Sequence, residues 1–281
     1  MITLSDLSAL RTQIESWRRG GNVAFVPTMG NLHEGHLALV RAARKLADRV
    51  VVSIFVNPLQ FGAGEDFDNY PRTMERDSSM LEGEGTDLLF APSVAVMYPK
   101  PQEQQTRVEV PGLSSLLCGA CRPGHFVGVS TVVCKLFNMV QPDIAVFGKK
   151  DFQQLMVIRR MVDDLAMPVR VVGAETVREA DGLAMSSRNG YLSPDERRTA
   201  PILYRVLSGV ATRLREGSDD YEGLQVQAAR ELEESGFTPD YVAIRRASDL
   251  QEPEADEKDL VVLAAANLGK ARLIDNIDLS R

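Results

Sequence analysis

Two of the three histidines in the chain, His33 and His36, lie three residues apart in the segment Met29-Gly30-Asn31-Leu32-His33-Glu34-Gly35-His36. The apolar run Val23 to Val26 precedes this segment, and apolar residues recur every three to four positions after it, which is typical of a strand, a loop and a helix. A helix N-terminus offers unpaired N–H groups and a partial positive charge, and imidazole donates hydrogen bonds to phosphate oxygens that gain charge. The spacing therefore indicates a loop that binds a nucleotide and acts on its α-phosphate. The simpler interpretation is a histidine that only caps the helix.

Two other polar segments have residue types that suit phosphate. Gly148-Lys149-Lys150-Asp151 follows the strand candidate Ile144 to Phe147, where a lysine reaches a phosphate as a mobile charge. Met185-Ser186-Ser187-Arg188 combines two hydroxyls with a guanidinium, a set that can hold the β- and γ-phosphates or a departing pyrophosphate. The alternatives are a pair of solvated lysines and a polar linker.

The third histidine, His125, lies in the turn-prone segment Arg122 to Phe126 and carries little information alone. Cys118 and Cys121 have the CxxC spacing of redox or zinc motifs, but the chain has no second CxxC, so reduced thiols are the better interpretation. The serine elbow GxSxG and the phosphate loop GxxxxGK[ST] are both absent from the sequence.

The elements expected around these segments alternate between strand and helix. The near-continuous apolar run Arg49 to Val56 is typical of a parallel strand buried on both faces. Further strand candidates are Asp87 to Phe90 and Val169 to Val172, and Phe152 to Leu165 has a helical pattern. The alternation predicts an α/β fold with a Rossmann-like, doubly wound parallel sheet, whose ligands bind beyond the carboxyl ends of the strands. Three polar segments, His33 to His36, Asn57 to Gln60 and Gly148 to Asp151, each follow a strand candidate, so they should converge on one crevice, whereas Met185 to Arg188 should lie between the two units.

The pattern changes after residue 176, which predicts a nucleotide-binding domain over residues 1–176 and a smaller C-terminal α+β lid domain over residues 177–281. Ser193-Pro194-Asp195-Glu196 is a capping box with proline at the first helical position, and a helix should follow it. A second helix is expected over about Tyr221 to Glu234. Three strands complete this unit, expected at Tyr241 to Ile244, Leu260 to Ala264 and Ala271 to Ile274.

Composition limits the class of protein. The chain has 281 residues, 44% of them hydrophobic, and a formal net charge of −7, which argues against broad nucleic-acid binding. No apolar stretch approaches the roughly 18 residues of a membrane span, and the N-terminal residues do not have the pattern of a signal peptide. We therefore expect a cytoplasmic protein with no membrane or nucleic-acid partner.

Several segments together resemble one enzyme family. PTMGNLHEGH, FVNPLQF, NYPRT, RPGHFVGVSTVV, KKDFQQL and VREADGLAMSSRN occur in this order between residues 27 and 189, and ARLIDNI lies near the C-terminus. Together they look like pantothenate synthetase (pantoate–β-alanine ligase). The HxGH segment and the serine-rich loop are shared with the wider nucleotidyltransferase superfamily, whereas FVNPLQF together with KDFQQL is far more specific and points to this one family.

The resemblance implies that pantoate attacks the α-phosphate of ATP, giving pantoyl adenylate and pyrophosphate, and that the amine of β-alanine then displaces AMP. It implies catalytic roles for His36, His33, Lys150 and Arg188. Gln60 and Gln154 would bind pantoate, with Gln60 also beside β-alanine, and His125 would lie near the phosphates in the substrate site. The ATP site would comprise Met29, Gly30, Asn31, Leu32, His33, Glu34, Gly35, His36, Gly148, Lys149, Lys150, Asp151, Val177, Met185, Ser186, Ser187 and Arg188.

Two segments depart from the family pattern. The usual Gly-Glu-Lys-Asp is here Gly-Lys-Lys-Asp, so Lys149 replaces an acid, although the spacing still favours Lys150 as the phosphate ligand. Where some members have several groups that assist Mg²⁺, this chain keeps only Asp77. Magnesium is therefore expected to arrive mainly on ATP. The resemblance also implies a homodimer.

Two other functions remain open from the sequence. A nucleotidyltransferase of the same superfamily would stop at an adenylylated product and release no AMP. A nucleotide-sensing module would bind ATP without turnover, although His33, His36, Lys150 and Arg188 weigh against it.

Overall fold

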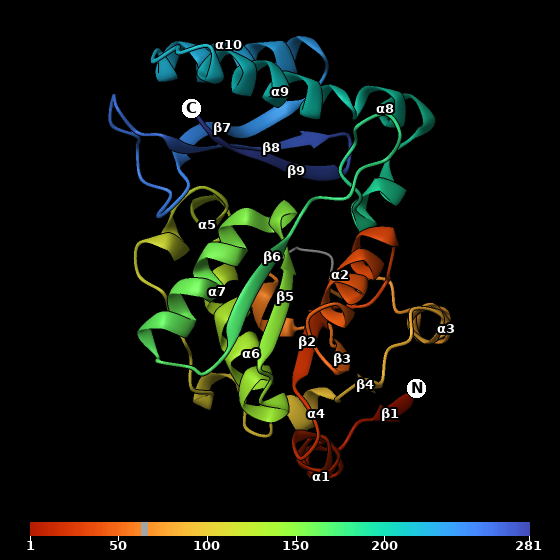
Figure 1. The fold of residues 1–281 in the computed structure, drawn as a ribbon. Coiled ribbons are helices and arrows are strands. Elements are labelled where there is room, and N and C mark those ends of the chain that lie inside the picture. The colour runs from red at the N-terminus through yellow and green to blue at the C-terminus, as the bar shows by residue number, and fades with distance from the viewer. Residues whose placement is uncertain (63–66) are drawn as a thin grey trace.

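The computed structural model describes residues 1–62 and 67–281, which form a larger N-terminal unit and a smaller C-terminal unit (Figure 1). The larger unit contains a six-stranded parallel sheet in the order β1-β4-β3-β2-β5-β6. Its strands are β1 (Ile2–Leu4), β2 (Val23–Thr28), β3 (Arg49–Ile54), β4 (Leu88–Phe90), β5 (Ile144–Gly148) and β6 (Arg170–Ala174). The Rossmann-like parallel sheet expected from the sequence is confirmed.

Helices cover both faces of this sheet, and two cores result. The helices of the larger unit are α1 (Leu7–Arg18), α2 (Glu34–Arg44), α3 (Met74–Gly83), α4 (Val94–Met97), α5 (Cys118–Cys121), α6 (His125–Val140) and α7 (Phe152–Asp164). Phe25 of β2 packs with α1, α6 and α7 on one face, whereas Val26 packs with α2 and α3 on the other. Burial on both faces explains why these strands are continuous apolar runs.

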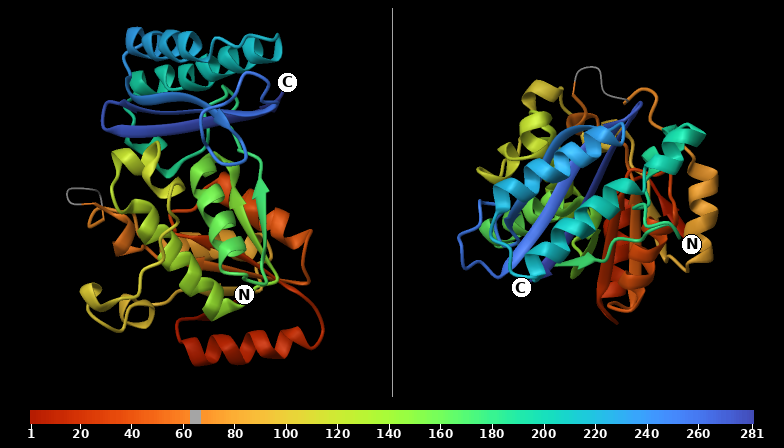
Figure 2. Two further views of the ribbon diagram at one scale, coloured as in Figure 1. Left: turned by 90° about the vertical axis from the view of Figure 1, so that its left-hand side faces the viewer. Right: turned by 90° about the horizontal axis from the view of Figure 1, so that it is seen from above.

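The C-terminal unit is an antiparallel sheet in the order β7-β8-β9. Its strands are β7 (Thr238–Arg246), β8 (Asp259–Leu268) and β9 (Ala271–Ser280), and its helices are α8 (Pro194–Thr199), α9 (Ile202–Arg215) and α10 (Tyr221–Glu234). Figure 2 shows α9 and α10 on the outer face of the sheet, away from the larger unit. The inner face contributes Val261 and Leu263 of β8 to the core of the larger unit, so apolar contact joins the two units.

Three details differ from the sequence-based expectations. The capping box at Ser193 starts only the short helix α8, and α9 begins separately after Pro201, whose missing N–H interrupts a continuous helix. The edge strand β1 was not predicted, because three residues carry almost no periodic signal. Helix α6 was also missed, since eleven of its residues are buried and its sequence has little polar alternation.

Candidate active site

The loop between β2 and α2 is held by its own backbone and by Asp77. Gly30 has a φ of +81° and Asn31 a φ of +51°, in the left-handed region that glycine and asparagine tolerate best. The buried carboxylate of Asp77 accepts hydrogen bonds from the N–H groups of Asn31, at 2.8 Å, and Leu32, at 2.9 Å. Thr73 Oγ1 lies 3.1 Å from Asp77 Oδ2 and donates to it. These contacts favour a structural role for Asp77 over the magnesium contact that the sequence suggested.

His33 and His36 both cap the N-terminus of α2. The capping role that was the simpler interpretation of this segment is therefore present. Nδ1 of His33 accepts the N–H of Gly35 at 3.1 Å, and Nδ1 of His36 accepts the N–H of His33 at 3.4 Å. A neutral imidazole whose Nδ1 accepts a hydrogen bond carries its proton on Nε2. Both residues line a cavity of about 220 Å³, and the ring centroids are 4.2 Å apart. The capping bonds therefore use Nδ1 of each ring and leave each Nε2–H as a possible donor on two residues that line the same cavity.

The electrostatic surroundings keep both imidazoles neutral. Burial, followed by the charge of Lys150, lowers the pKa of His33 to about 4. Burial, followed by the neighbouring His33 and Lys150, lowers the pKa of His36 to about 3. At neutral pH both rings are therefore hydrogen-bond donors without a net charge, and Lys150 supplies positive charge beside them.

Gly35 is needed for this arrangement. A Cβ at position 35 would lie 2.8 Å from Cε1 of His33, closer than real contacts allow. Any larger residue would move the His33 ring, which explains why the segment reads His-Glu-Gly-His.

The two lysines after β5 have different surroundings. Lys150 lines the 220 Å³ cavity and also an adjoining cavity of about 720 Å³. Nζ of Lys149 forms ion pairs with Glu175, at 2.6 Å, and with Asp278 of β9, at 2.9 Å. Lys149 is therefore not the solvated lysine that the sequence suggested, but a link between the two units. This geometry favours Lys150 over Lys149 as the phosphate ligand.

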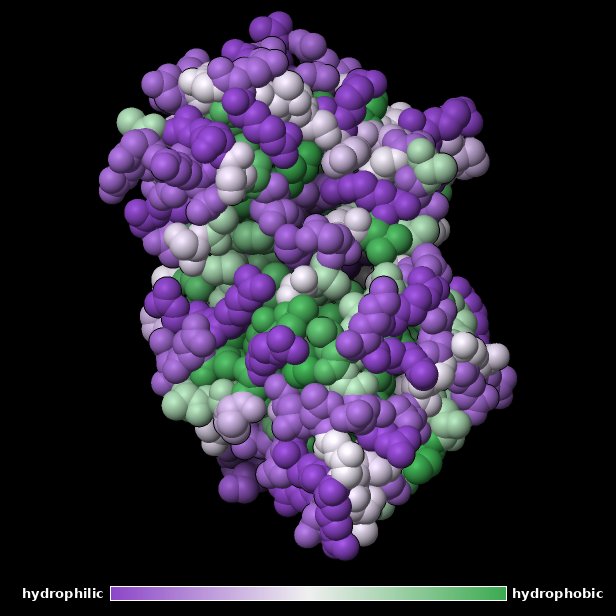
Figure 3. Space-filling view, viewed as in Figure 1, coloured by the Kyte–Doolittle hydropathy of each residue, from purple (hydrophilic) through white to green (hydrophobic). Residues whose placement is uncertain are grey.

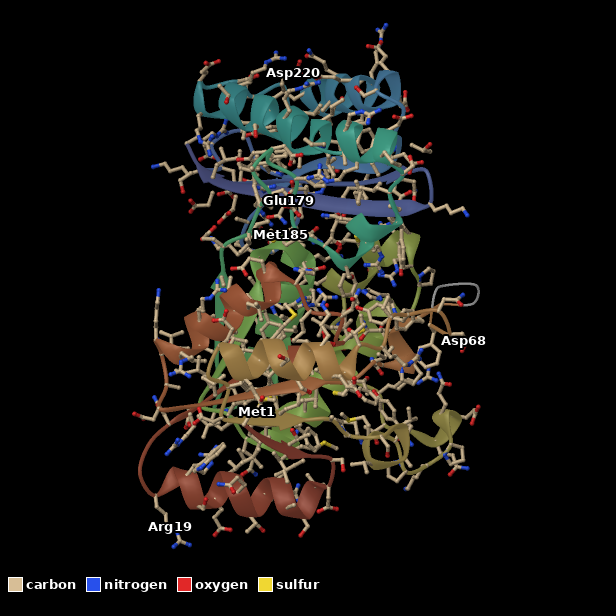
Figure 4. All side chains as sticks on the ribbon, turned by 90° about the vertical axis from the view of Figure 1, so that its right-hand side faces the viewer. Met1, Arg19, Asp68, Glu179, Met185 and Asp220 are labelled. Atoms are coloured by element: carbon tan, nitrogen blue, oxygen red, sulfur yellow. The ribbon has the colours of Figure 1, made fainter. Side chains whose placement is uncertain are left out.

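The serine-rich segment lies where the two units meet, and Figure 4 shows its first residue, Met185, between the larger unit and the C-terminal unit. The N–H of Met185 donates to the carbonyl of Val177 at 3.0 Å, which fixes the segment to the strand-like stretch before it. The hydroxyl of Ser186 accepts the N–H of Arg188 at 3.2 Å and starts a 3₁₀ turn over Ser187–Tyr191. This turn brings Arg188 to the wall of both cavities.

Gln60 and Gln154 both line the smaller cavity, from different elements. The amide of Gln60 is fixed because its Oε1 accepts from Asn57 Nδ2 at 3.0 Å and its Nε2 lies 3.0 Å from the sulfur of Met29. His125, at the start of α6, contacts the carbonyl of Gln60 through Nδ1 at 2.8 Å. Gly128 lets α6 approach this turn, since a Cβ there would lie 2.2 Å from the Leu59 carbonyl oxygen.

Most of the predicted site residues come together at these two cavities. The smaller cavity is lined by Met29, His33, Gly35, His36, Gln60, Gly148, Lys150, Asp151, Gln154, Val177, Met185, Ser186, Ser187 and Arg188. The larger one is lined by His125, Lys150, Asp151, Gln154, Ser186 and Arg188, together with residues of β7, β8 and β9. The convergence expected at the carboxyl ends of the strands is present.

Other predicted residues make different contacts. Leu32 is buried in the core between the sheet and α2, and Glu34 is exposed and paired with Arg41. Gly30 and Asn31 shape the loop through their backbone. Within the described part of the chain, no group of three or more His, Cys, Asp or Glu side chains could hold a metal ion. Cys118 and Cys121 are free thiols, and Sγ of Cys118 contacts the hydroxyl of Tyr241 at 3.0 Å.

Sequence reasoning assigned no role to several residues that support the site. Asn57 is buried and fixes Gln60, while its own Oδ1 accepts from the hydroxyl of Tyr98 at 2.8 Å. Asp275 and Asn276 of β9 are both buried, and Asn276 donates to the carbonyl of Lys150. The available signal was polar residues inside ARLIDNI, because asparagine and aspartate are uncommon in strands and need partners when buried.

The pattern of this site agrees with comparisons to known proteins. A sequence model of the family described as pantoate-beta-alanine ligase matches residues 2–278 of the chain. The chain belongs to the pantoate–β-alanine ligase family. Relatives named pantothenate synthetase from Shewanella loihica and Shewanella oneidensis are each 56% identical over 282 residues, covering 100% of both chains.

Solved structures of family members have the same fold. The crystal structure of pantothenate synthetase from Thermus thermophilus is 48% identical, covers 100% of both chains and gives a TM-score of 0.92. The pantoate–β-alanine ligase of Francisella tularensis, described as complexed with beta-gamma ATP and β-alanine, is 32% identical with a TM-score of 0.81. It is matched over 99% of this chain and 97% of its own. No helix among the described residues is long and apolar enough to span a membrane.

Proposed function

We propose that the protein is a pantoate–β-alanine ligase that joins pantoate to β-alanine with ATP and releases AMP and pyrophosphate. The family match over residues 2–278 supports the overall reaction. One structural observation supports the roles of the residues. His33, His36, Lys150 and Arg188 line the same cavity as Gln60 and Gln154. This lining supports the proposal, because groups suited to phosphate and neutral amide groups share one cavity, as a reaction between a nucleotide and a small polar acid requires.

In this proposal the Nε2–H groups of His33 and His36 donate to oxygens of the α-phosphate. They stabilise the transition state most, because negative charge on these oxygens increases as the pantoate carboxylate attacks. The charge of Lys150 and the guanidinium of Arg188 hold the β- and γ-phosphates, and the hydroxyls of Ser186 and Ser187 add hydrogen bonds. Asp151 binds the ribose, and Gly148 and Val177 line the adenosine pocket.

Gln60 and Gln154 bind the hydroxyls and carboxylate of pantoate in this proposal. The carboxylate oxygen attacks phosphorus, the bond to pyrophosphate breaks, and a pantoyl adenylate forms. The amine of β-alanine, bound beside Gln60, then attacks the acyl carbon and AMP leaves. His125 contributes through its contact with the Gln60 carbonyl.

Magnesium belongs to this proposal as a companion of ATP. The carboxylate of Asp77 already accepts hydrogen bonds from two backbone N–H groups and a hydroxyl. Because Mg²⁺ prefers phosphate oxygens and retained waters, we propose that it enters the site on the triphosphate and without Asp77 as a ligand.

The C-terminal unit, residues 177–281, acts as a lid in this proposal. Met185 to Arg188 lie at the junction, and closure would keep water from a hydrolysable acyl adenylate. Hydrogen exchange at the junction should slow when a non-hydrolysable ATP analogue binds. Unchanged exchange would contradict the lid.

A homodimer and a cytoplasmic location complete the proposal. Figure 3 shows apolar side chains gathered over β6, an edge strand of the larger sheet, and an apolar edge of this kind favours pairing with another chain. Light scattering on the purified protein tests the dimer, and cell fractionation tests the location.

The decisive experiment incubates the protein with ATP, pantoate and β-alanine and measures AMP and pantothenate. Formation of both in equal amounts, dependent on all three substrates, is the expected result. An adenylylated product without AMP would identify a nucleotidyltransferase instead. ATP binding without any turnover would identify a nucleotide-sensing module.

A further inference from the structure

Strand β9 of the C-terminal unit holds the backbone of the segment that carries Lys150. Nδ2 of Asn276 donates to the carbonyl of Lys149 at 2.9 Å and to the carbonyl of Lys150 at 2.8 Å. Asn276 is only 5% exposed, so water does not replace these bonds. Both carbonyls belong to the 3₁₀ turn Lys149–Asp151, and one amide group therefore fixes two successive residues of that turn.

The side chain of Lys150 has no such support of its own. Within residues 1–62 and 67–281, no hydrogen bond or ion pair is formed by its Nζ. Its position depends on where the backbone of the turn lies. Lys149 differs, because Glu175 and Asp278 hold its ammonium group directly.

The neighbouring residue of β9 ties Asn276 to Arg178, whose backbone forms a bridge with Ala184 directly before the serine-rich segment. The carboxylate of Asp275 accepts two hydrogen bonds from the guanidinium of Arg178, at 2.6 and 2.9 Å, and also accepts the N–H of Asn276 at 2.8 Å. Arg178 donates to the carbonyl of Gly182 at 3.1 Å, and its guanidinium carbon lies 3.7 Å from the ring centre of Tyr204. A paired, buried carboxylate of this kind fixes geometry well.

We propose that Asn276 is a positioning residue for Lys150, held in register by the Asp275–Arg178 pair. Strand β9 then sets the distance between Lys150 and the segment from Ser186 to Arg188, which together hold the phosphates. The inference rests on the proposed function and adds a part of the C-terminal sheet to it. Asn276 acts through Lys150 and does not itself react.

The test is a double-mutant cycle between Asn276→Ala and Lys150→Ala. Displacing a charged group by about 1 Å costs up to about 100-fold in rate, so Asn276→Ala should lower kcat/KM for ATP by about 10- to 100-fold. In the Lys150→Ala variant, adding Asn276→Ala should lower kcat/KM for ATP by less than about twofold. The affinity for a non-hydrolysable ATP analogue, measured by calorimetry, gives the same cycle where turnover is too slow to follow.

A general loss of structure would act differently. In that case Asn276→Ala would lower kcat/KM by the same factor in the wild type and in the Lys150→Ala variant, and this result would overturn the proposal. Wild-type kinetics in the Asn276→Ala variant would also overturn it. Asn276→Ser keeps one donor and should recover part of the rate, which serves if the alanine variant does not fold. Asn138→Ala is the matched control, because Asn138 is exposed on α6 and its amide, among the described residues, bonds only to Cys134 of the same helix. If the wild type itself forms no pantothenate, the proposed function fails, whereas an active wild type with no coupling rejects only this inference.

Discussion

The N–H of Asn31 donates a 2.8 Å hydrogen bond to Oδ2 of Asp77, although the two residues are 46 positions apart. Asn31 has a left-handed backbone, which is unfavourable unless the surroundings hold it. Asp77 lies on α3, so that helix determines the shape of the loop that carries His33. Asp77, for which the sequence suggested a magnesium contact, therefore also holds the frame of the site.

Asp77→Ala should destabilise the protein and weaken ATP binding together. Removing the carboxylate leaves the N–H groups of Asn31 and Leu32 without their partner, and we expect the free energy of unfolding to fall by about 3 kcal/mol. Urea denaturation and the KM for ATP measure both effects. Ser79→Ala, a change on the same helix, is the control. Normal stability combined with a raised magnesium requirement would restore the metal role.

His36→Ala should reduce turnover far more than ATP affinity. Because the imidazole N–H bonds most strongly as charge develops on the phosphate, we expect kcat to fall by about 100- to 1,000-fold with a modest change in KM for ATP. His36→Asn is the companion variant, since its side-chain oxygen can still accept the N–H of His33 and preserve the helix cap. A normal kcat with a large loss of affinity would show that the assigned role is wrong.

Lys150→Ala should be more damaging than Lys149→Ala. Lys150 faces both cavities, whereas Lys149 pairs with Glu175 and Asp278. We expect Lys149→Ala to cost mainly stability, by about 1 kcal/mol or less, because its pairs are partly exposed. Steady-state kinetics and thermal unfolding of both variants distinguish the two roles. Equal losses of activity would mean that both lysines contact phosphate.

The lowered histidine pKa values predict a pH dependence of stability. The unfolded chain protonates its histidines near pH 6.5, but the folded chain does so only near pH 4 at His33 and near pH 3 at His36. Between these values the unfolded state binds more protons, so the free energy of unfolding must fall as the pH is lowered from 6.5. Well above pH 6.5 these two residues contribute no slope.

Urea denaturation of wild type and His36→Asn between pH 5 and pH 8 measures this effect. As the pH falls below 6.5, the free energy of unfolding of the wild type should decrease more than that of the variant. Above pH 6.5 the difference between the two proteins should be constant. A constant difference over the whole range would mean that the pKa of His36 is the same in the folded and the unfolded protein.

The sequence predicted the parts of the fold whose signal is local. The buried parallel strands were visible as apolar runs, and α10 was placed at Tyr221–Glu234 because its polar and apolar residues alternate with helical period. The capping box at Ser193 was found for the same reason. Each of these features depends on residues close together in the chain.

What the sequence did not predict depends on contacts between distant residues. The hydrogen bonds of Asp77 and Asn276 join partners 46 and 126 positions away, and no local pattern indicates which backbone group a polar side chain will meet. Lys149 and Lys150 are adjacent and chemically identical, so only the direction of each side chain separates an ion-pair link from a cavity residue.

The order of the chemistry gives the last prediction. If pantoate is activated first, the enzyme should exchange labelled pyrophosphate into ATP when pantoate is present and β-alanine is absent. Such exchange requires an adenylate that forms reversibly and stays in the site, where His33, His36, Lys150 and Arg188 surround the cavity. A direct phosphorylation would instead release ADP, and a concerted reaction of three substrates would show no exchange without the amine.

Hydroxylamine provides an independent check on the same intermediate. As a strong nucleophile it can replace β-alanine. With ATP, pantoate and hydroxylamine but no β-alanine, pantoyl hydroxamate should accumulate and AMP should form in equal amount. His36→Ala should slow exchange and hydroxamate formation by the same factor, because both pass through the first transition state. Asn138→Ala should leave both rates unchanged, since the exposed amide of Asn138 bonds to Cys134 within α6. If an enzyme that makes pantothenate showed neither exchange nor hydroxamate, the adenylate route would have to be abandoned.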